Sequence, residues 1–170
     1  MAIMTQSEHC YGRSAQDLRG NTLTPTAMGA RAALETFYYA FNQRSLPVFD
    51  AVWAPHALIQ LNNPLGGVQR GHERIRALYQ RIFKGPAQVW VELYDIVEYM
   101  GKETAVFAGR ERGEFVLDNV TVPLNIRTTR VFHYLRAELG WRQVHHHGSI
   151  DDADLLRHYQ KAVQGEATTN

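Results

Sequence analysis

The stretch Gly140-Trp-Arg-Gln-Val-His-His-His-Gly-Ser149 decides the expected fold, because it has the composition of a long strand that ends at a polar turn. Successive side chains of a strand point to opposite faces. Simple alternation therefore puts four side chains on one face: Trp141, Gln143, His145 and His147. His146 is expected to face the other way, at a surface or an interface.

Three earlier segments share this period of two, and short turns containing Gly, Asp or Asn separate them. The four segments are residues 88–100, 103–117, 121–135 and 141–149. Alternating strands joined by such turns are typical of antiparallel hairpins. The second half of the chain is therefore expected to form an antiparallel sheet.

Helical periodicity appears on both sides of these strands. Apolar residues at spacings of three and four predict helices over residues 26–43, 48–53, 71–84 and 151–163, and residues 57–62 predict a short strand. Helices grouped on one face of an antiparallel sheet are typical of α+β proteins. The expected fold class is α+β, with a strongly bent antiparallel sheet whose concave face carries the N-terminal helices and forms a cone-shaped pocket.

Length and composition indicate one globular domain. The chain has 170 residues, 45% of them hydrophobic, and the domain is expected to span residues 26–163. Residues 1–25 carry few apolar positions and are expected to form a flexible N-terminal arm. Residues 164–170 are expected to be a frayed tail.

The charge balance bears on partners and location. The 18 basic and 17 acidic residues leave a net charge of +1, so no nucleic-acid or membrane partner is expected. The single cysteine, Cys10, cannot form an intramolecular disulfide. There is no long apolar run and no hydrophobic region of a signal peptide, so a cytoplasmic location is expected.

The end of the chain also carries a recognisable motif. Residues Thr129-Arg-Val-Phe-His133, followed by the tryptophan and histidines of 141–149, resemble the last two strands of the nuclear transport factor 2-like superfamily. That superfamily includes SnoaL-like cyclases, ketosteroid isomerases and scytalone dehydratase. The pattern is most similar to the association domain of calcium/calmodulin-dependent protein kinase II, and the resemblance covers about residues 28–160.

The resemblance implies a bent sheet around a pocket and a pocket arginine at Arg130. It departs at Glu111, which matches the position of a second pocket arginine in the association domain. Binding of the same anion-like ligands is therefore not implied.

Pairing the hairpins about Gly101-Lys102 and Asp118-Asn119, and Tyr134 with Trp141, predicts the residues of the pocket face. We expect Glu111, His145 and His147 to be catalytic. The expected ligand-binding residues, which combine aromatic rings with a few polar groups, are Tyr38, Trp53, Trp90, Glu92, Phe107, Arg130, Phe132 and Gln143.

These residues support one main hypothesis and one alternative. The main hypothesis is a SnoaL-like protein, without a cofactor, that binds a small, partly apolar molecule and is an isomerase, cyclase or dehydratase acting by acid–base chemistry. The alternative is a non-enzymatic association module. Ketosteroid isomerase activity itself is not transferred, because residues 58–62 contain no acid to serve as the base.

A metal site is a further alternative for the histidines. His145 and His147 on one face, together with Glu111, would supply three ligands of types that suit zinc or iron. The simpler interpretation makes both histidines hydrogen-bonded strand residues, and no metal is assigned.

The opposite sheet face is expected to pair with a second copy of the chain, because an apolar face that no helix covers must be buried by something. Its expected apolar residues are Val89, Val91, Leu93, Val97, Val106, Ala108, Val131 and Val144, with Arg110, Arg112 and Arg127 beside them. The sequence thus predicts a homodimer through this face.

Overall fold

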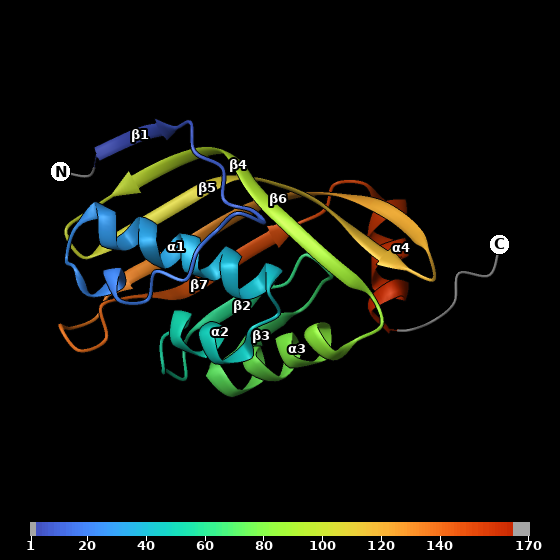
Figure 1. Ribbon diagram of the computed structural model, residues 1–170, viewed down its shortest axis with the longest axis horizontal. Helices are drawn as coiled ribbons and strands as arrows, with labels where there is room; N and C mark the ends of the chain where they lie inside the picture. The colour runs from blue at the N-terminus through green and yellow to red at the C-terminus, as the bar shows by residue number, and fades with distance from the viewer. Residues whose placement is uncertain (1–2, 165–170) are drawn as a thin grey trace.

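A curved sheet of seven strands arches over the helices, and its edges do not close into a barrel (Figure 1). The computed structural model describes residues 3–164. The strand order is β1-β4-β5-β6-β7-β2-β3. The strands are β1 (Ile3–Ser7), β2 (Gln60–Asn62), β3 (Val68–Arg70), β4 (Gln88–Met100), β5 (Thr104–Leu117), β6 (Val120–Tyr134) and β7 (Trp141–Ser149). This architecture confirms the predicted α+β fold class.

The four long strands β4 to β7 form consecutive antiparallel pairs, and each lies within one residue of its predicted limits. Asp118 and Asn119 form the predicted turn between β5 and β6, with φ values of 49° and 64°. Asp and Asn tolerate this left-handed conformation better than most residues. β2 pairs with β7 in parallel, and the short strand β3, which was not predicted, pairs with β2.

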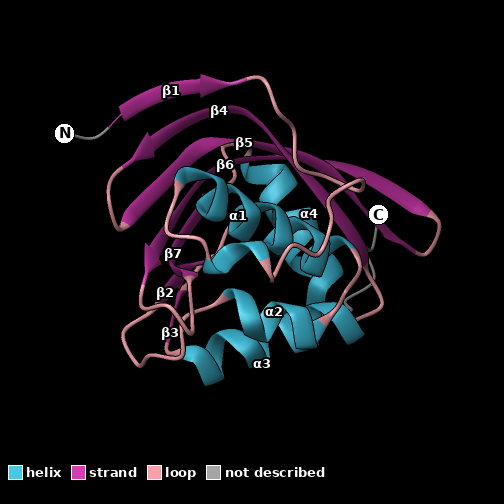
Figure 2. Ribbon diagram, turned by 60° about the vertical axis from the view of Figure 1, so that its left-hand side comes forward, coloured by secondary structure: helices cyan, strands magenta, loops and turns pink. Residues whose placement is uncertain are grey.

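The helices lie beneath the concave side of the sheet (Figure 2). They are α1 (Ala27–Asn42), α2 (Leu46–Val52), α3 (His72–Lys84) and α4 (Ala153–Gln164), with a short 3-10 helix at Asn21–Leu23. Thr26 caps α1 by accepting a hydrogen bond from the backbone of Gly29 at 3.4 Å. α4 packs on the β5–β6 hairpin, where the rings of Tyr159 and Phe115 stack with centroids 5.1 Å apart.

The segment before α1 contributes to the fold. β1 adds an edge strand to β4, and the backbone of Tyr11 exchanges two hydrogen bonds with Leu93, of 3.0 and 2.9 Å. The side chains of Tyr11 and Ala15 are buried in the core. Residues 3–23, expected to belong to a flexible arm, are thus packed against the domain. Of the predicted tail, residues 165–170 lie outside the described residues.

A β-bulge in β4 changes which side chains face inward. Tyr94 pairs with Arg110, but the next pair is Val97 with Ala108, and Asp95 within the bulge has a φ of 51°. Before the bulge the odd-numbered residues from Val89 to Leu93 are buried, and after it Ile96 and Glu98 are buried. The predicted inward orientation of Trp90 and Glu92 is wrong for this reason: both side chains lie on the convex side.

A second bulge, in β7, reverses the predicted histidines. Val131 pairs with His145 while Phe132 pairs with Gln143, so Val144 is an extra residue in β7. Gln143 and His146 are buried, His145 is partly exposed and His147 is exposed. The predicted inward orientation of His145 and His147, and the outward orientation of His146, are therefore wrong.

The convex face is correspondingly smaller than predicted. Val89, Val91 and Leu93 are buried in the core rather than on this face. A partly exposed apolar strip remains across the middle strands, formed by Val97, Val106, Ala108 and Val131, whereas Val144 packs against the core. Among the described residues, no helix has both the length and the apolar character needed to cross a membrane.

Candidate functional site

Four secondary-structure elements bring a polar cluster into the apolar core. Tyr38 comes from the buried face of α1, Glu111 from β5, Arg130 from β6 and Gln143 from β7. Each strand residue occupies an inward position of its strand, and all four side chains are at most 3% exposed. Buried polar groups are costly unless they are hydrogen-bonded, so their contacts decide what this cluster can do.

Arg130 and Glu111 form a buried ion pair bridged by Tyr38. The Arg130 guanidinium donates to Glu111 Oε1 over 2.8 Å, and the Tyr38 hydroxyl donates to the same oxygen over 2.6 Å. Arg130 Nε donates to the Tyr38 hydroxyl over 2.9 Å, and its third nitrogen donates to Gln143 Oε1 over 3.3 Å. Every nitrogen of the guanidinium therefore has a protein partner.

Aromatic rings hold the guanidinium in place as well. The Cζ atom of Arg130 lies 3.6 Å from the ring centroid of Phe37 and 5.0 Å from that of Tyr38. A cation over an aromatic face is attracted by the ring quadrupole, more strongly where water is excluded. Packing and hydrogen bonds together fix the orientation of Arg130.

Burial and charge set the protonation states of the cluster. Burial raises the pKa of Tyr38 well above its usual value, so the hydroxyl keeps its proton. Burial alone would lower the pKa of Arg130, but the facing Tyr38 and Glu111 groups outweigh it and the pKa is raised. The guanidinium stays charged, and Glu111 is its counter-charge.

His146 adds a neutral imidazole beside this cluster. Its side chain is 2% exposed, and its Nε2 lies 2.9 Å from the hydroxyl of Thr128. Its Nδ1 is buried and has no hydrogen-bond partner among the described residues. Burial, followed by the nearby charge of Arg130, lowers the pKa of His146 well below its usual value. The ring is therefore uncharged at neutral pH.

These groups line a small internal space, which we call the inner cavity. It has a volume of about 40 Å³, and its polar lining includes Glu111, Arg130 and His146. Asn63 also lines it, and the other lining residues are aromatic or aliphatic: Phe37, Phe41, Leu61, Pro64, Leu65, Leu78, Tyr79, Ile82, Val91, Ile126 and Tyr159. The turn after β2 and the helix α4 close it, joined by a 2.6 Å hydrogen bond from Gln160 to the Leu65 carbonyl.

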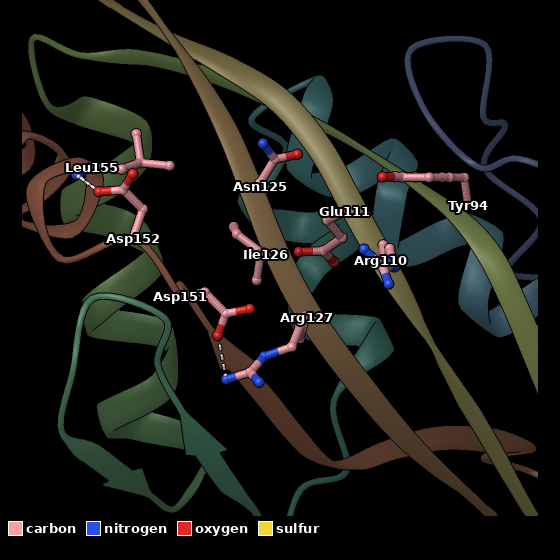
Figure 3. A pocket seen from close by; sticks show the side chains of 9 residues that line it. All are labelled: Tyr94, Arg110, Glu111, Asn125, Ile126, Arg127, Asp151, Asp152 and Leu155. Atoms are coloured by element: carbon pink, nitrogen blue, oxygen red, sulfur yellow. Dashed lines mark hydrogen bonds and ion pairs between the residues drawn. The ribbon is translucent and has the colours of Figure 1, made fainter.

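A larger depression, the outer pocket, opens where β7 leaves the edge of β6 (Figure 3). It has a volume of about 370 Å³, and Arg127 pairs with Asp151 across it at 2.6 Å. Glu111 and Ile126 line both the outer pocket and the inner cavity. The second carboxylate oxygen of Glu111, Oε2, accepts no hydrogen bond from the described residues, so it has the capacity to accept one from a ligand.

The structure brings together only part of the predicted site. Glu111 and Arg130 line the inner cavity, and Tyr38 and Gln143 bind them directly. Three further predicted residues are buried but do not line the cavity: Trp53, Phe107 and Phe132. Four lie on the convex side of the sheet: Trp90, Glu92, His145 and His147.

The three-ligand metal site considered for the histidines is not assembled. Glu111 faces the concave side, whereas His145 and His147 face away from it. In the part of the chain that the structure describes, no group of three or more His, Cys, Asp or Glu side chains is placed to hold a metal ion.

Sequence reasoning missed His146, Tyr79 and Tyr159 as cavity residues. The two tyrosines belong to the apolar faces of α3 and α4, and their helical spacing alone could have placed them beneath the sheet. Simple alternation along β7 could not have identified His146, because the bulge at Val144 reverses the faces to which the following side chains point.

Comparisons with known proteins agree with this fold. The SnoaL-like domain family model matches residues 30–153. A solved structure from Thiobacillus denitrificans, assigned as a calcium/calmodulin-dependent protein kinase type II association domain, is 27% identical, with a TM-score of 0.58 over 75% of this chain and 97% of that chain.

Two further solved structures share the fold at lower identity. One, from Streptomyces avermitilis and assigned as a dehydratase of the nuclear transport factor 2-like family, is 20% identical, with a TM-score of 0.61 over 71% of this chain and 93% of that chain. The other, a ketosteroid isomerase-like protein from Erwinia carotovora atroseptica, is 16% identical, with a TM-score of 0.60 over 72% of this chain and 94% of that chain.

No curated protein matches the chain. The family match covers well over half of the sequence, and the bent sheet with helices beneath it is the fold shared with the solved relatives. The chain therefore belongs to the SnoaL-like domain family, and it shares its fold with proteins of the nuclear transport factor 2-like superfamily.

Proposed function

We propose that this protein binds a small, mostly apolar molecule in the inner cavity and moves a proton on it with Glu111 as the base. The observation that carries the proposal is the state of the Glu111 carboxylate. Oε1 is held by Tyr38 and Arg130, while Oε2 accepts no hydrogen bond from residues 3–164, and Glu111 lines both the inner cavity and the outer pocket. A base must be fixed in position and reachable by the proton that it removes.

The surroundings of Glu111 suit this role. The apolar rings and side chains of the cavity exclude water, which strengthens electrostatic interactions between the site and a reacting group. Arg130 balances the carboxylate charge before reaction, and Tyr38 keeps Oε1 in a single orientation. The reaction class is proton transfer at carbon, the step that isomerases, cyclases and dehydratases share.

A space of about 40 Å³ holds only about three water molecules. Binding of an organic substrate therefore requires α4 or the turn at residues 63–67 to move. In α4, Tyr159 lines the cavity and Gln160 donates a hydrogen bond to the Leu65 carbonyl in that turn.

The experiment follows deuterium exchange into a panel of small carbon acids in D2O, by proton NMR, with the full chain. The panel contains a cyclic ketone, a nitroalkane and a nitrile. We expect the wild type to accelerate exchange of at least one compound and Glu111→Gln to lose that acceleration. The matched control is Glu92→Gln, since Glu92 lies on the convex side of β4. Exchange by Glu111→Gln at the wild-type rate contradicts the proposal.

A second candidate function, the association module, rests on a different observation. The partly exposed apolar strip of Val97, Val106, Ala108 and Val131 lies on the convex face, where none of the four described helices packs (Figure 2). The solved relatives include structures assigned as association domains. We propose that a second copy of this chain covers the strip, and the assembly state of the variants described in the Discussion tests it.

A further inference from the structure

We infer that the inner cavity selects an uncharged ligand bearing a carbonyl-type oxygen, which accepts a hydrogen bond from Nδ1–H of His146. This inference rests on the proposed function, because it names the class of molecule that the same cavity takes. It depends on the charge balance of the cavity and on the position of the proton on His146.

The charge balance excludes a simple anion site. Arg130 is the one cation that lines the inner cavity in the described structure, and all of its nitrogens already donate to Tyr38, Glu111 and Gln143. Its charge is cancelled by Glu111 at 2.8 Å. An added carboxylate or phosphate would thus be a buried charge without a counter-charge, which is strongly unfavourable. An uncharged ligand carries no such penalty.

The contact with Thr128 lets us assign the tautomer of His146, since the 2.9 Å distance by itself permits either partner to donate. The Thr128 hydroxyl has one hydrogen to donate, and its only hydrogen-bond partner among the described side chains is Nε2 of His146, at 2.9 Å. Donation to Nε2 satisfies the buried hydroxyl and requires that the proton of the neutral ring sits on Nδ1. The unpartnered Nδ1 is then a buried donor without an acceptor.

A buried donor without a partner costs free energy, and a ligand oxygen that accepts from it recovers that cost. A neutral imidazole is also a suitable donor to a carbonyl next to a carboxylate base, since it polarises the carbonyl as the base removes the proton. His146 and Glu111 line the same cavity. The structure thus places a donor for the oxygen and a base for the carbon in one enclosure.

The tautomer can be tested without a ligand. Long-range proton–nitrogen correlation spectra of the ¹⁵N-labelled full chain at pH 7, assigned by the loss of one ring in His146→Phe, should show His146 as the Nδ1–H form. Thr128→Val should shift that ring toward the Nε2–H form. A wild-type spectrum of the Nε2–H form would overturn the inference.

The ligand class is tested by NMR titration with three probes of similar size: cyclohexanone, methylenecyclohexane and cyclohexanecarboxylate. Cyclohexanone should bind the wild type at least about tenfold more tightly than the carboxylate, as expected for an unpaired buried charge. The ratio of the cyclohexanone and methylenecyclohexane dissociation constants should change by about tenfold in His146→Phe, the effect of losing one buried hydrogen bond.

The outcomes separate the inference from the proposed function. If none of the three probes binds, the proposed function fails and the inference fails with it. If the carboxylate binds best, or if His146→Phe leaves the ratio unchanged, the cavity binds small molecules but the inference is wrong. If His146→Phe does not fold, the same ratio measured in Thr128→Val should move in the same direction, and an unchanged ratio there overturns the inference.

Discussion

The Tyr38 hydroxyl lies between the two charges of a buried ion pair, 2.6 Å from Glu111 Oε1 and 2.9 Å from Arg130 Nε. It is the only neutral group that donates to one member of the pair and accepts from the other in the described structure. The hydroxyl therefore couples α1 to the two central strands of the sheet.

Removing this hydroxyl should weaken both the fold and the site. Tyr38→Phe deletes two buried hydrogen bonds, one to each charged group, and should lower the free energy of unfolding by about 1–3 kcal/mol. Urea unfolding measures the change, and deuterium exchange should slow because Glu111 Oε1 loses one of its two donors. Tyr39→Phe, the next residue and only partly buried, is the control. Equal stability losses in both variants would assign the effect to α1 rather than to the hydroxyl.

The ion pair itself should behave as a unit. Arg130→Met or Glu111→Leu alone leaves one uncompensated buried charge and should cost about 3–5 kcal/mol, whereas the double variant should be much closer to the wild type. Chemical denaturation of the four proteins gives the coupling energy. The exposed pair Arg112 and Glu92, on the convex side of β4 and β5, should show little coupling in a parallel cycle. Similar coupling energies in both cycles would contradict the prediction that burial makes Arg130 and Glu111 act as a unit.

Stability should fall as the pH drops below about 6.5. The pKa of His146 in the fold lies well below its unfolded value of 6.5, so only the unfolded chain binds this proton as the pH falls through that value. The loss should approach about 1.4 kcal/mol per pH unit until the pH reaches the folded pKa. Burial and the charges of Arg130, His145 and His147 all act in this direction.

Denaturation midpoints between pH 5 and pH 8 measure this effect. His146→Phe should flatten the curve below pH 6.5, apart from a smaller part that His145 contributes, since burial lowers its pKa as well. His133→Asn, at an exposed convex position, should leave the slope unchanged. A wild-type slope that survives in His146→Phe would show that another group causes it.

A charge on the convex strip should separate the proposed dimer. Val131→Glu places a carboxylate among the apolar side chains of the central strands, where pairing would bury it without a partner. Sedimentation velocity should show the dimer of the wild type and a monomer for the variant. Thr121→Glu, exposed at the far end of β6, should remain a dimer. A monomeric wild type would contradict the association module.

Periodicity predicted most of the fold because each long element has one buried face. The apolar stripe of residues 26–43 became α1, and the predicted pairing of Tyr134 with Trp141 is present. The polar cluster was predicted in part for the same reason, since Glu111 and Arg130 keep the expected parity on β5 and β6. Those two strands pair without a bulge along their whole length.

The parts of the fold and of the site that were predicted wrongly depend on features that composition does not reveal. A bulge adds one residue, so the inward-facing positions change parity across it, as at Asp95 and Val144, and nothing in the composition of the two strands marks that point. The segment around Tyr11 was missed because backbone hydrogen bonds to Leu93, rather than an apolar pattern, hold it on the sheet. Two properties can be read only from the strand pairing in the structure. One is which side chains face inward beyond a bulge, and the other is whether a segment is attached through its backbone.

The bulge at Val144 also makes the cavity tolerant of small insertions and deletions. His145, His146 and His147 are consecutive, so a shift of β7 by one residue in either direction would replace one inward imidazole by another. A chain lacking Val144 should lose the bulge, keep His146 opposite Arg130 and still show one buried, neutral histidine ring in its nitrogen spectrum. Insertion of one alanine after Val144 should instead bring His145 to this position, so the same insertion combined with His145→Ala should show none. Three identical neighbours give this position a redundancy that a single histidine could not provide.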